Sequence, residues 1–209
     1  MLIPDETALR QHFDPTMELS KSKQMSKLDK HSLNFIAKSP FLTIATANKD
    51  GKADVSPRGD PPGFVKAVGA KTLIIPDRPG NNRLDTMVNI VENPNVALLF
   101  FIPGLEDTLR VAGRARIIKD AALLSQCLVN GKVPKVAIAV DIDEIFFHCA
   151  KALKRSHFWG PEHRVAKSDM PSLARIILDQ TSANGVCEDD DYVDKTDKDI
   201  EQQYKTELY

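Results

Sequence analysis

Alternating apolar and polar residues recur through the middle of the chain and predict β-strands there. In the segment TLRVAGRARII, residues 108–118, one face carries leucine, valine, alanine and isoleucine, and the other face carries three arginines. Such patterns predict about six strands, at residues 41–47, 53–55, 72–76, 96–102, 108–118 and 136–149. Because most connections between them are short, antiparallel pairing is favoured. We expect a mainly β fold, a barrel with peripheral helices.

Helical spacing of apolar residues appears in three places. Residues 26–38 predict a helix ahead of the first strand. Residues 82–94 predict the one clearly helical connection between strands, and Pro94 ends it. Residues 171–180 predict a third helix, beyond the strands.

The end of the chain is rich in charge. The EDDD run at residues 188–191 and the charged tail to Tyr209 predict a segment that lies on the surface or is partly disordered. Ile200, Tyr204 and Leu208 form one narrow helical stripe, which is too small to stabilise a helix unless the helix docks on another surface. We expect no contact between this tail and a cofactor.

The charges of the chain nearly cancel. With 28 basic and 29 acidic residues the net charge is -1, so no overall field attracts nucleic acid or an anionic membrane, and any anion site must be local. The apolar runs are too short to span a bilayer, and the N-terminal residues lack the basic start and apolar block of a signal peptide. We expect a soluble, cytoplasmic protein.

The cysteine and histidine positions favour neither a disulfide frame nor a metal site. Cys127, Cys149 and Cys187 are odd in number and far apart, which fits reduced thiols. The histidines near Cys149 fit no closed zinc spacing, so we expect no metal. The chain also has no GxGxxG after a strand and no GxxxxGK[ST], which excludes dinucleotide-binding and P-loop motifs.

One short motif, SPRGDPPGF at residues 56–64, places an arginine and an aspartate among three prolines and two glycines. We predict a rigid turn that holds Arg58, with Ser56 and Asp60 beside it, as a preformed anion site. The alternative is a tight corner in which Arg58 and Asp60 neutralise one another in solvent.

The strongest local signal is IPDRPGNNRLD at residues 75–85, where a strand end and a Pro-Gly turn lead to an arginine at the first turn of the predicted helix. The free N–H groups and positive dipole end of a helix N-terminus, with two arginines, make a phosphate cradle. The candidate residues are Pro76, Asp77, Arg78, Asn81, Asn82 and Arg83. The alternative is that Asn81 only caps the helix and Asp85 pairs with a nearby arginine.

A basic cluster follows the last predicted strand in HCAKALKRSHFW, residues 148–159. Its candidate residues are Lys151, Lys154, Arg155 and Ser156. The alternative is a basic amphipathic turn that covers the core.

The chain resembles the pyridoxamine 5'-phosphate oxidase-like FMN-binding split-barrel family over residues 27–162. The resemblance rests on four segments in this order: FLTIATANKDGKADVSPRGDPPGF, LIIPDRPGNNRLDTMVNIVENPNVALLFFIPG, TLRVAGRARI and FFHCAKALKRSHFW. The motifs SPRGDPPGF and RPGNNR are similar to those of a bacterial branch. The resemblance implies a six-stranded antiparallel Greek-key split barrel, a homodimer, and FMN in the cleft between subunits.

The resemblance also implies roles for the candidate residues. Residues 56–60, with Arg58, match the region of the second strand beside the flavin. Residues 76–83 match the loop and helix start that grip the FMN phosphate, with Arg83 as the expected clamp and Asn82 beside it. Residues 151–156 match a late segment that approaches the cofactor. The chain then divides into a helical extension (1–40), an FMN-binding split barrel (41–162) and a helical, charged extension (163–209).

The chain also departs from the family pattern. The Arg-Leu-His-x-Arg signature that holds substrate in pyridoxamine phosphate oxidases is absent, so vitamin B6 is not the expected substrate. We expect an FMN-dependent oxidoreductase acting on an unidentified small molecule, and no catalytic acid, base or nucleophile stands out. Two alternatives stay open: a non-catalytic protein that stores or senses flavin, and a split barrel that binds deazaflavin F420 or haem.

Overall fold

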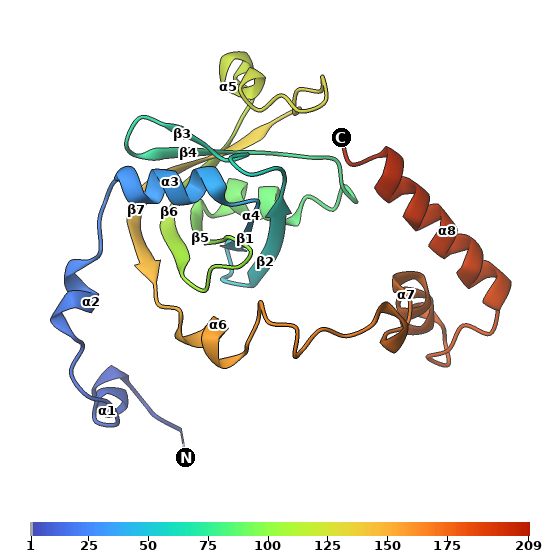
Figure 1. Ribbon diagram of the computed structural model, residues 1–209, viewed down its shortest axis with the longest axis horizontal. Coiled ribbons are helices and arrows are strands. Elements are labelled where there is room, and N and C mark those ends of the chain that lie inside the picture. The colour runs from blue at the N-terminus through green and yellow to red at the C-terminus, as the bar shows by residue number, and fades with distance from the viewer. Residues whose placement is uncertain (1) are drawn as a thin grey trace.

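Seven antiparallel strands form one sheet at the centre of the computed structural model, which describes residues 2–209 (Figure 1). The strands are β1 (Phe41–Ala47), β2 (Ala53–Gly59), β3 (Lys66–Val68), β4 (Thr72–Pro76), β5 (Asn95–Phe101), β6 (Thr108–Ile118) and β7 (Ala137–His148). Their order in the sheet is β2-β1-β5-β6-β7-β4-β3. The prediction of a mainly β fold with antiparallel pairing is confirmed.

The number of strands and the closure of the sheet differ from the sequence prediction. Each of the six predicted strands is present, and the seventh is β3, a three-residue strand that pairs with β4. So short a strand shows no alternation by which to recognise it. Within residues 2–209, β2 and β3 are the two edges of the sheet, so the sheet is open and is not a closed six-stranded barrel.

The core lies on one face of the central strands. Alternate residues of β1, β5 and β6 supply its buried side chains, which include Leu42, Ile44, Val96, Leu98, Phe100, Leu109 and Val111. Each such side chain stabilises the fold by about 1.5–3 kcal/mol when fully buried. The cluster therefore gives the loops at the sheet ends a rigid support.

A β-bulge bends the longest strand pair. The pairing of β6 with β7 shifts register between Ala112 and Gly113. A β-carbon on Gly113 would overlap the main-chain oxygen of Asp141, so the chains can approach this closely only because residue 113 is glycine. Because a bulge increases local bend and twist, it helps the sheet to curl around the core.

Some helices lie against the sheet and others extend away from it (Figure 1). They are α1 (Glu6–Arg10), α2 (Glu18–Ser22), α3 (Lys30–Lys38), α4 (Asp85–Glu92), α5 (Ala121–Ser125), α6 (Lys151–Arg155), α7 (Leu173–Thr181) and α8 (Asp190–Thr206). The three predicted helices correspond to α3, α4 and α7. Helix α3 begins later than the pattern suggested because Asp29 and Ser32 form a capping box that fixes its start.

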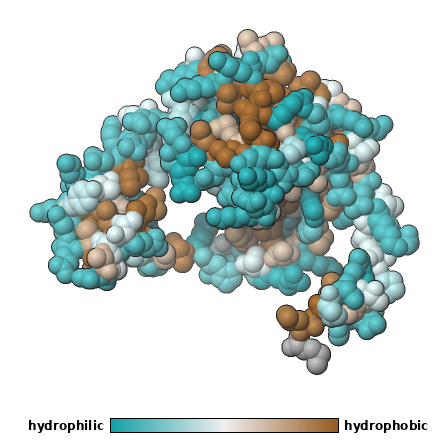
Figure 2. Space-filling view, turned by 180° about the vertical axis from the view of Figure 1, so that it is seen from behind, coloured by the Kyte–Doolittle hydropathy of each residue, from teal (hydrophilic) through white to brown (hydrophobic). Residues whose placement is uncertain are grey.

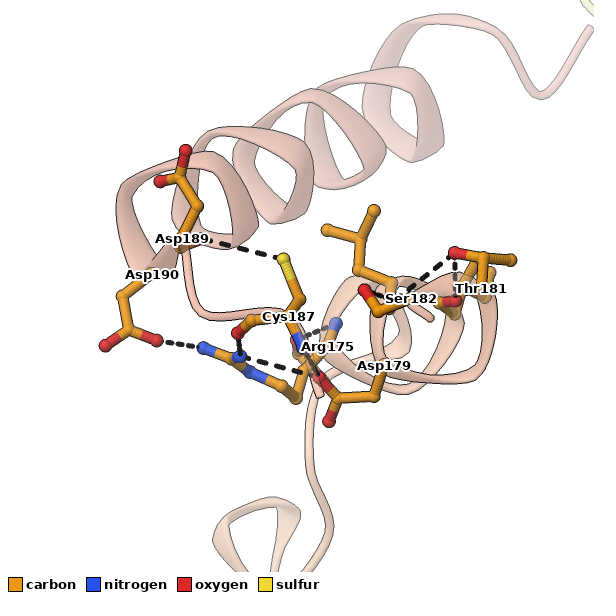
Figure 3. A network of polar contacts seen from close by, with 10 residues as sticks. Arg175, Asp179, Thr181, Ser182, Cys187, Asp189 and Asp190 are labelled. Atoms are coloured by element: carbon orange, nitrogen blue, oxygen red, sulfur yellow. Dashed lines mark hydrogen bonds and ion pairs between the residues drawn. The ribbon is translucent and has the colours of Figure 1, made fainter. Parts of the chain in front are cut away.

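The tail forms a helix whose residues are mostly exposed, which agrees with the surface alternative and with a helix that docks on another surface. Helix α8 packs against α7, where Val193 and Ala174 are buried. Figure 3 shows what fixes the turn between the helices: Arg175 donates to the main-chain oxygen of Cys187 at 2.7 Å and pairs with Asp190. We call α7, α8 and the residues after them, 173–209, the C-terminal lobe.

We call the seven-stranded sheet and the helices packed on it the barrel, although the sheet is open. The C-terminal lobe stands away from the barrel along most of its length. A gap separates it from the barrel in Figure 1 and, seen from behind, in Figure 2. The chain end returns at the far end of α8 to the loops that follow β2 and β4 (Figure 1). Within residues 2–209, no helix combines the length and the apolar character needed to cross a membrane.

Candidate functional site

A polar cavity of about 180 Å³ lies where β2, the loop after β4 and the start of α4 meet. It is lined by Ser56, Arg58, Asp77, Arg78, Gly80, Asn81, Asn82, Arg83, Leu84, Asp85, Thr86 and Met87. The structure therefore brings together seven of the residues selected from the two sequence motifs. We call this cavity the cradle.

Arg58 is held by a strand and not by the predicted turn. The strand β2 continues through Gly59, and Arg58 lies opposite Leu42 of β1 in the register of the pair. Pro57, which has no N–H to donate, is tolerated because β2 is an edge strand. The Pro- and Gly-rich turn follows, and there Gly63 adopts φ 80°.

Two ion pairs cross between the motifs. Arg58 Nη1 lies 3.1 Å from Asp77 Oδ1, and both side chains are about one-fifth exposed. Arg78 Nε lies 2.6 Å from Asp60 Oδ2, and the Asp60 side chain is only 2% exposed. The alternative in which Arg58 and Asp60 neutralise one another is therefore wrong, because each pairs across to the other motif. Together the two pairs join the end of β2 to the loop after β4.

One donor of Arg58 is both buried and unpaired. Its Nε is buried and has no hydrogen-bond partner among the described residues, although the side chain lines the cradle. Leaving a charged donor buried and unpaired costs free energy, so an oxygen that reached this donor would stabilise it.

The approach to α4 is more irregular than predicted. The helix begins at Asp85, so Arg83 precedes it and does not lie in its first turn. Asn82 and Leu84 both adopt left-handed backbone angles, with φ 56° and 60°. Leu84 supplies no side-chain cap, so the first N–H groups of α4 stay available beside the cradle.

Arg83 lies on the rim of the cradle. Its Nε is 2.8 Å from Asp85 Oδ2 and its side chain is 73% exposed. The hydrogen bond that Arg83 donates to Asp85, and the charge of that carboxylate, raise the pKa of Arg83 above the usual value. The alternative pairing of Asp85 with an arginine is thus confirmed. Asn81 does not cap the helix; it accepts from the Arg83 N–H at 3.1 Å and shapes the loop.

Ser56 and Pro76 have supporting positions. The Thr86 hydroxyl donates to Ser56 Oγ at 3.0 Å, which ties the first turn of α4 to β2. Pro76 is the last residue of β4 and lies opposite Ala137 of β7. It lines a neighbouring cavity of about 420 Å³ that also touches Arg58 and Arg78.

The basic cluster of α6 is not at the cradle. Lys151, Lys154, Arg155 and Ser156 lie on or directly after α6, which Figure 1 places at a different end of the barrel. None of these four residues lines the cradle or the cavity beside Pro76. The Trp159 indole N–H donates to the main-chain oxygen of Leu105 at 2.8 Å and fastens the segment there.

Tyr209 is the residue that the sequence did not reveal. Its hydroxyl lies 2.5 Å from Asp60 Oδ1, and its ring lies 5.5 Å from the Arg78 guanidinium carbon. The contact spans 149 residues of sequence, and no local motif marks it. The tail, expected to lie apart from the site, thus touches two of the predicted site residues.

Arg78 is fixed on several sides. Besides Asp60 and Tyr209, it donates from Nη2 to the main-chain oxygen of Cys127 at 2.9 Å. Its side chain is 15% exposed. Such a guanidinium is preorganised, because little rotamer freedom is left to lose when an anion arrives.

No curated protein matches this chain. Several solved structures are similar to it over the barrel. HupZ from Group A Streptococcus is 18% identical, with 57% of this chain and 93% of that chain covered and a TM-score of 0.48. A putative pyridoxamine 5'-phosphate oxidase from Lactobacillus delbrueckii is 20% identical, with 58% and 95% covered and a TM-score of 0.47. The FAD binding protein from Mycobacterium smegmatis is 16% identical, with 59% and 97% covered and a TM-score of 0.41.

The family comparison agrees with the resemblance of the motifs. The family model described as pyridoxamine 5'-phosphate oxidase matches residues 28–149, more than half of the chain. The match includes β1 to β7 and both loops of the cradle. The chain belongs to the pyridoxamine 5'-phosphate oxidase family.

Proposed function

We propose that this protein is an FMN-binding flavoprotein, an oxidoreductase that acts on a small molecule, and that the cradle holds the FMN phosphate. The observation that carries the proposal is Arg58, whose side chain lines the cradle together with Arg78 and Arg83 and whose buried Nε has no hydrogen-bond partner among the described residues. Family membership supports the same proposal.

The donors of the cradle suit a phosphate. Arg58 brings its guanidinium to the cradle, and α4 begins beside it without a side-chain cap on its first N–H groups. Charge-assisted hydrogen bonds of this kind are about twice as strong as neutral ones. Arg83 and Asn82 lie at the rim, where they would contact the phosphate from the solvent side.

The protein residues have binding and orienting roles in this proposal. When bound, a flavin supplies the electron chemistry through its ring system, and the protein supplies position and electrostatics. Asp77 fixes the Arg58 guanidinium from one side, and Asp60 fixes Arg78. The two carboxylates thus keep the arginines in place before the ligand arrives.

The proposal includes a homodimer with the cofactor at the subunit interface. Support comes from the face of the sheet that points away from the core, where β1, β2 and β5 carry apolar side chains that are partly or fully exposed. These are Phe41, Ala45, Val55, Ala97, Leu99 and Phe101. An exposed apolar face of this kind is typical of an interface. In a dimer, the α6 cluster of one subunit would serve the cofactor of the other.

The test is to purify the full chain, record its absorbance and identify the released ligand by mass spectrometry. The proposal expects a flavin spectrum and FMN, reduced by a donor such as NADH or NADPH and reoxidised in turnover. Bound FMN that never turns over would favour a storage or sensing protein. Deazaflavin F420, haem or no ligand would overturn the FMN assignment.

A further inference from the structure

A second, larger cavity opens next to the cradle. It has a volume of about 560 Å³ and lies between the loop after β4, the loop before β7 and the end of the C-terminal lobe. Arg78 and Asn82 line both this cavity and the cradle. The two spaces are therefore neighbours that share one wall. We call the second space the tail cavity.

The walls of the tail cavity combine positive charge with apolar surface. Lys132 and Lys135 come from the loop before β7, together with Val133 and Pro134. The carboxylates at the cavity are Asp77, which is already paired with Arg58, and Glu207 at the tail. Arg78 is also paired, with Asp60, so among the described residues two lysines without an ion pair face one unpaired carboxylate at this cavity, and Val133 and Pro134 separate the two lysines in sequence.

Tyr209 closes one side of the tail cavity. Its hydroxyl binds Asp60, its ring lies near Arg78, and its main-chain oxygen accepts from Lys132 Nζ. Among residues 2–209, the hydrogen bonds and ion pairs that join the C-terminal lobe to the barrel all involve this residue. A helix pair that is attached at one residue can leave and return without breaking the barrel.

The geometry points to the tail cavity as a binding site for a small organic phosphate of nucleotide size, closed over its ligand by Tyr209. Three cations line the cavity from two elements, Arg78 from the loop after β4 and Lys132 and Lys135 from the loop before β7, and can share the oxygens of one phosphate. Val133 and Pro134 would contact the organic part. The assignment extends the proposed function, on which it rests, by giving this protein a second ligand beside the cofactor.

The experiment titrates adenosine monophosphate into the full chain as purified and measures the affinity by calorimetry, with adenosine as the uncharged comparison. If the tail cavity is this site, adenosine monophosphate should bind saturably and adenosine should bind much more weakly. Lys135→Ala should weaken the binding about tenfold. Lys49→Ala is the control, because Lys49 lies in the exposed turn between β1 and β2. Failure to bind adenosine monophosphate, or equal affinities for the two variants, would overturn the site.

The closing role of Tyr209 has its own readout. Tyr209→Phe keeps the ring and removes the donor to Asp60, so adenosine monophosphate should bind about threefold to tenfold more weakly. Adenosine monophosphate should also slow hydrogen exchange of residues 203–209 in the unchanged protein. Tyr204→Phe on α8 is the matched control. If adenosine monophosphate left the hydrogen exchange rate of residues 203–209 unchanged, Tyr209 would not have the closing role.

The two proposals fail in different ways. Loss of FMN binding in the full chain would remove the cradle assignment whatever the nucleotide does. Nucleotide binding that is independent of Lys135, in a protein that still binds FMN, would remove only the tail cavity.

Discussion

Arg58 and Asp77 meet at 3.1 Å although β2 stands at one end of the strand order and β4 stands next to the other end. Such a contact requires the sheet to curl until its ends face one another. Arg78 and Asp60 make the same crossing at 2.6 Å. The cradle therefore lies at the seam where the open sheet nearly closes, and the two ion pairs bridge that seam.

Arg58→Ala should weaken FMN binding by about tenfold to a hundredfold. The change removes a charged donor and leaves Asp77 without its partner. Fluorescence titration of FMN into the apoprotein measures the effect. Arg164→Ala, in an exposed segment away from the cradle, is the control. An Arg58 variant that bound FMN as tightly as this control would remove Arg58 from the site.

Arg83→Ala should weaken FMN binding less than Arg58→Ala does, by less than about tenfold, although the motif suggested Arg83 as the main phosphate ligand. Arg83 is 73% exposed and already paired with Asp85, and exposed ion pairs contribute little. The same titration compares the two variants. A larger loss for Arg83→Ala than for Arg58→Ala would show that the loop rearranges around the ligand.

Docking of the tail should weaken at high pH. The hydrogen bond to Asp60, together with burial, raises the pKa of Tyr209 above its usual value. The contribution of Tyr209 to docking is therefore fully present below the ordinary tyrosine pKa. It is lost as the pH rises through the higher pKa that Tyr209 has in the docked state. Tyrosinate absorbance, compared between the unchanged protein and Tyr209→Phe, follows this titration. A difference curve with a pKa at or below the ordinary value would contradict the contact.

Gly113→Ala should destabilise the fold by about 3 kcal/mol, because the added carbon meets the main chain of β7. Denaturant unfolding measures the loss. Gly80→Ala provides the comparison, since its β-carbon would enter open space. Equal stability of the two variants would mean that the bulge can open without cost.

The thiols should differ in reactivity. Cys149 is exposed, whereas Cys127 is buried and burial raises the pKa of its thiol. Since the thiolate is the reactive form, Cys149 should react rapidly with a thiol reagent and Cys127 only on unfolding. Mass spectrometry of partly labelled protein identifies the site. Rapid labelling of Cys127 would indicate that the region beneath Arg78 opens readily.

The long strands and the two motifs could be predicted because their information is local. Alternation over 108–118 reports a strand with one buried face, and the turn chemistry of 75–85 reports a polar loop before a helix. The structure brings these motifs together at the cradle. The expectation that the two motifs lie at the same cofactor came from the resemblance to the family.

The features that were predicted wrongly or not at all depend mainly on contacts between residues far apart in the sequence. Whether Ser56 to Gly59 form a turn or a strand is decided by pairing with β1, which overrides the Pro and Gly residues. The start of α4 is set by left-handed residues that no periodicity reveals. The contact of Tyr209 with Asp60 joins two segments with no shared pattern, so sequence reasoning had no signal for it.

The open sheet also affects whether copies of this protein aggregate through their sheet edges. Each edge of a sheet offers unpaired main-chain groups that can recruit a strand from another molecule and begin aggregation. Here one edge is β3, which is only three residues long, and the other is β2, in which Pro57 has no N–H to offer. Both edges are therefore poor templates, so strand-to-strand stacking into fibres is disfavoured even though the barrel is not closed.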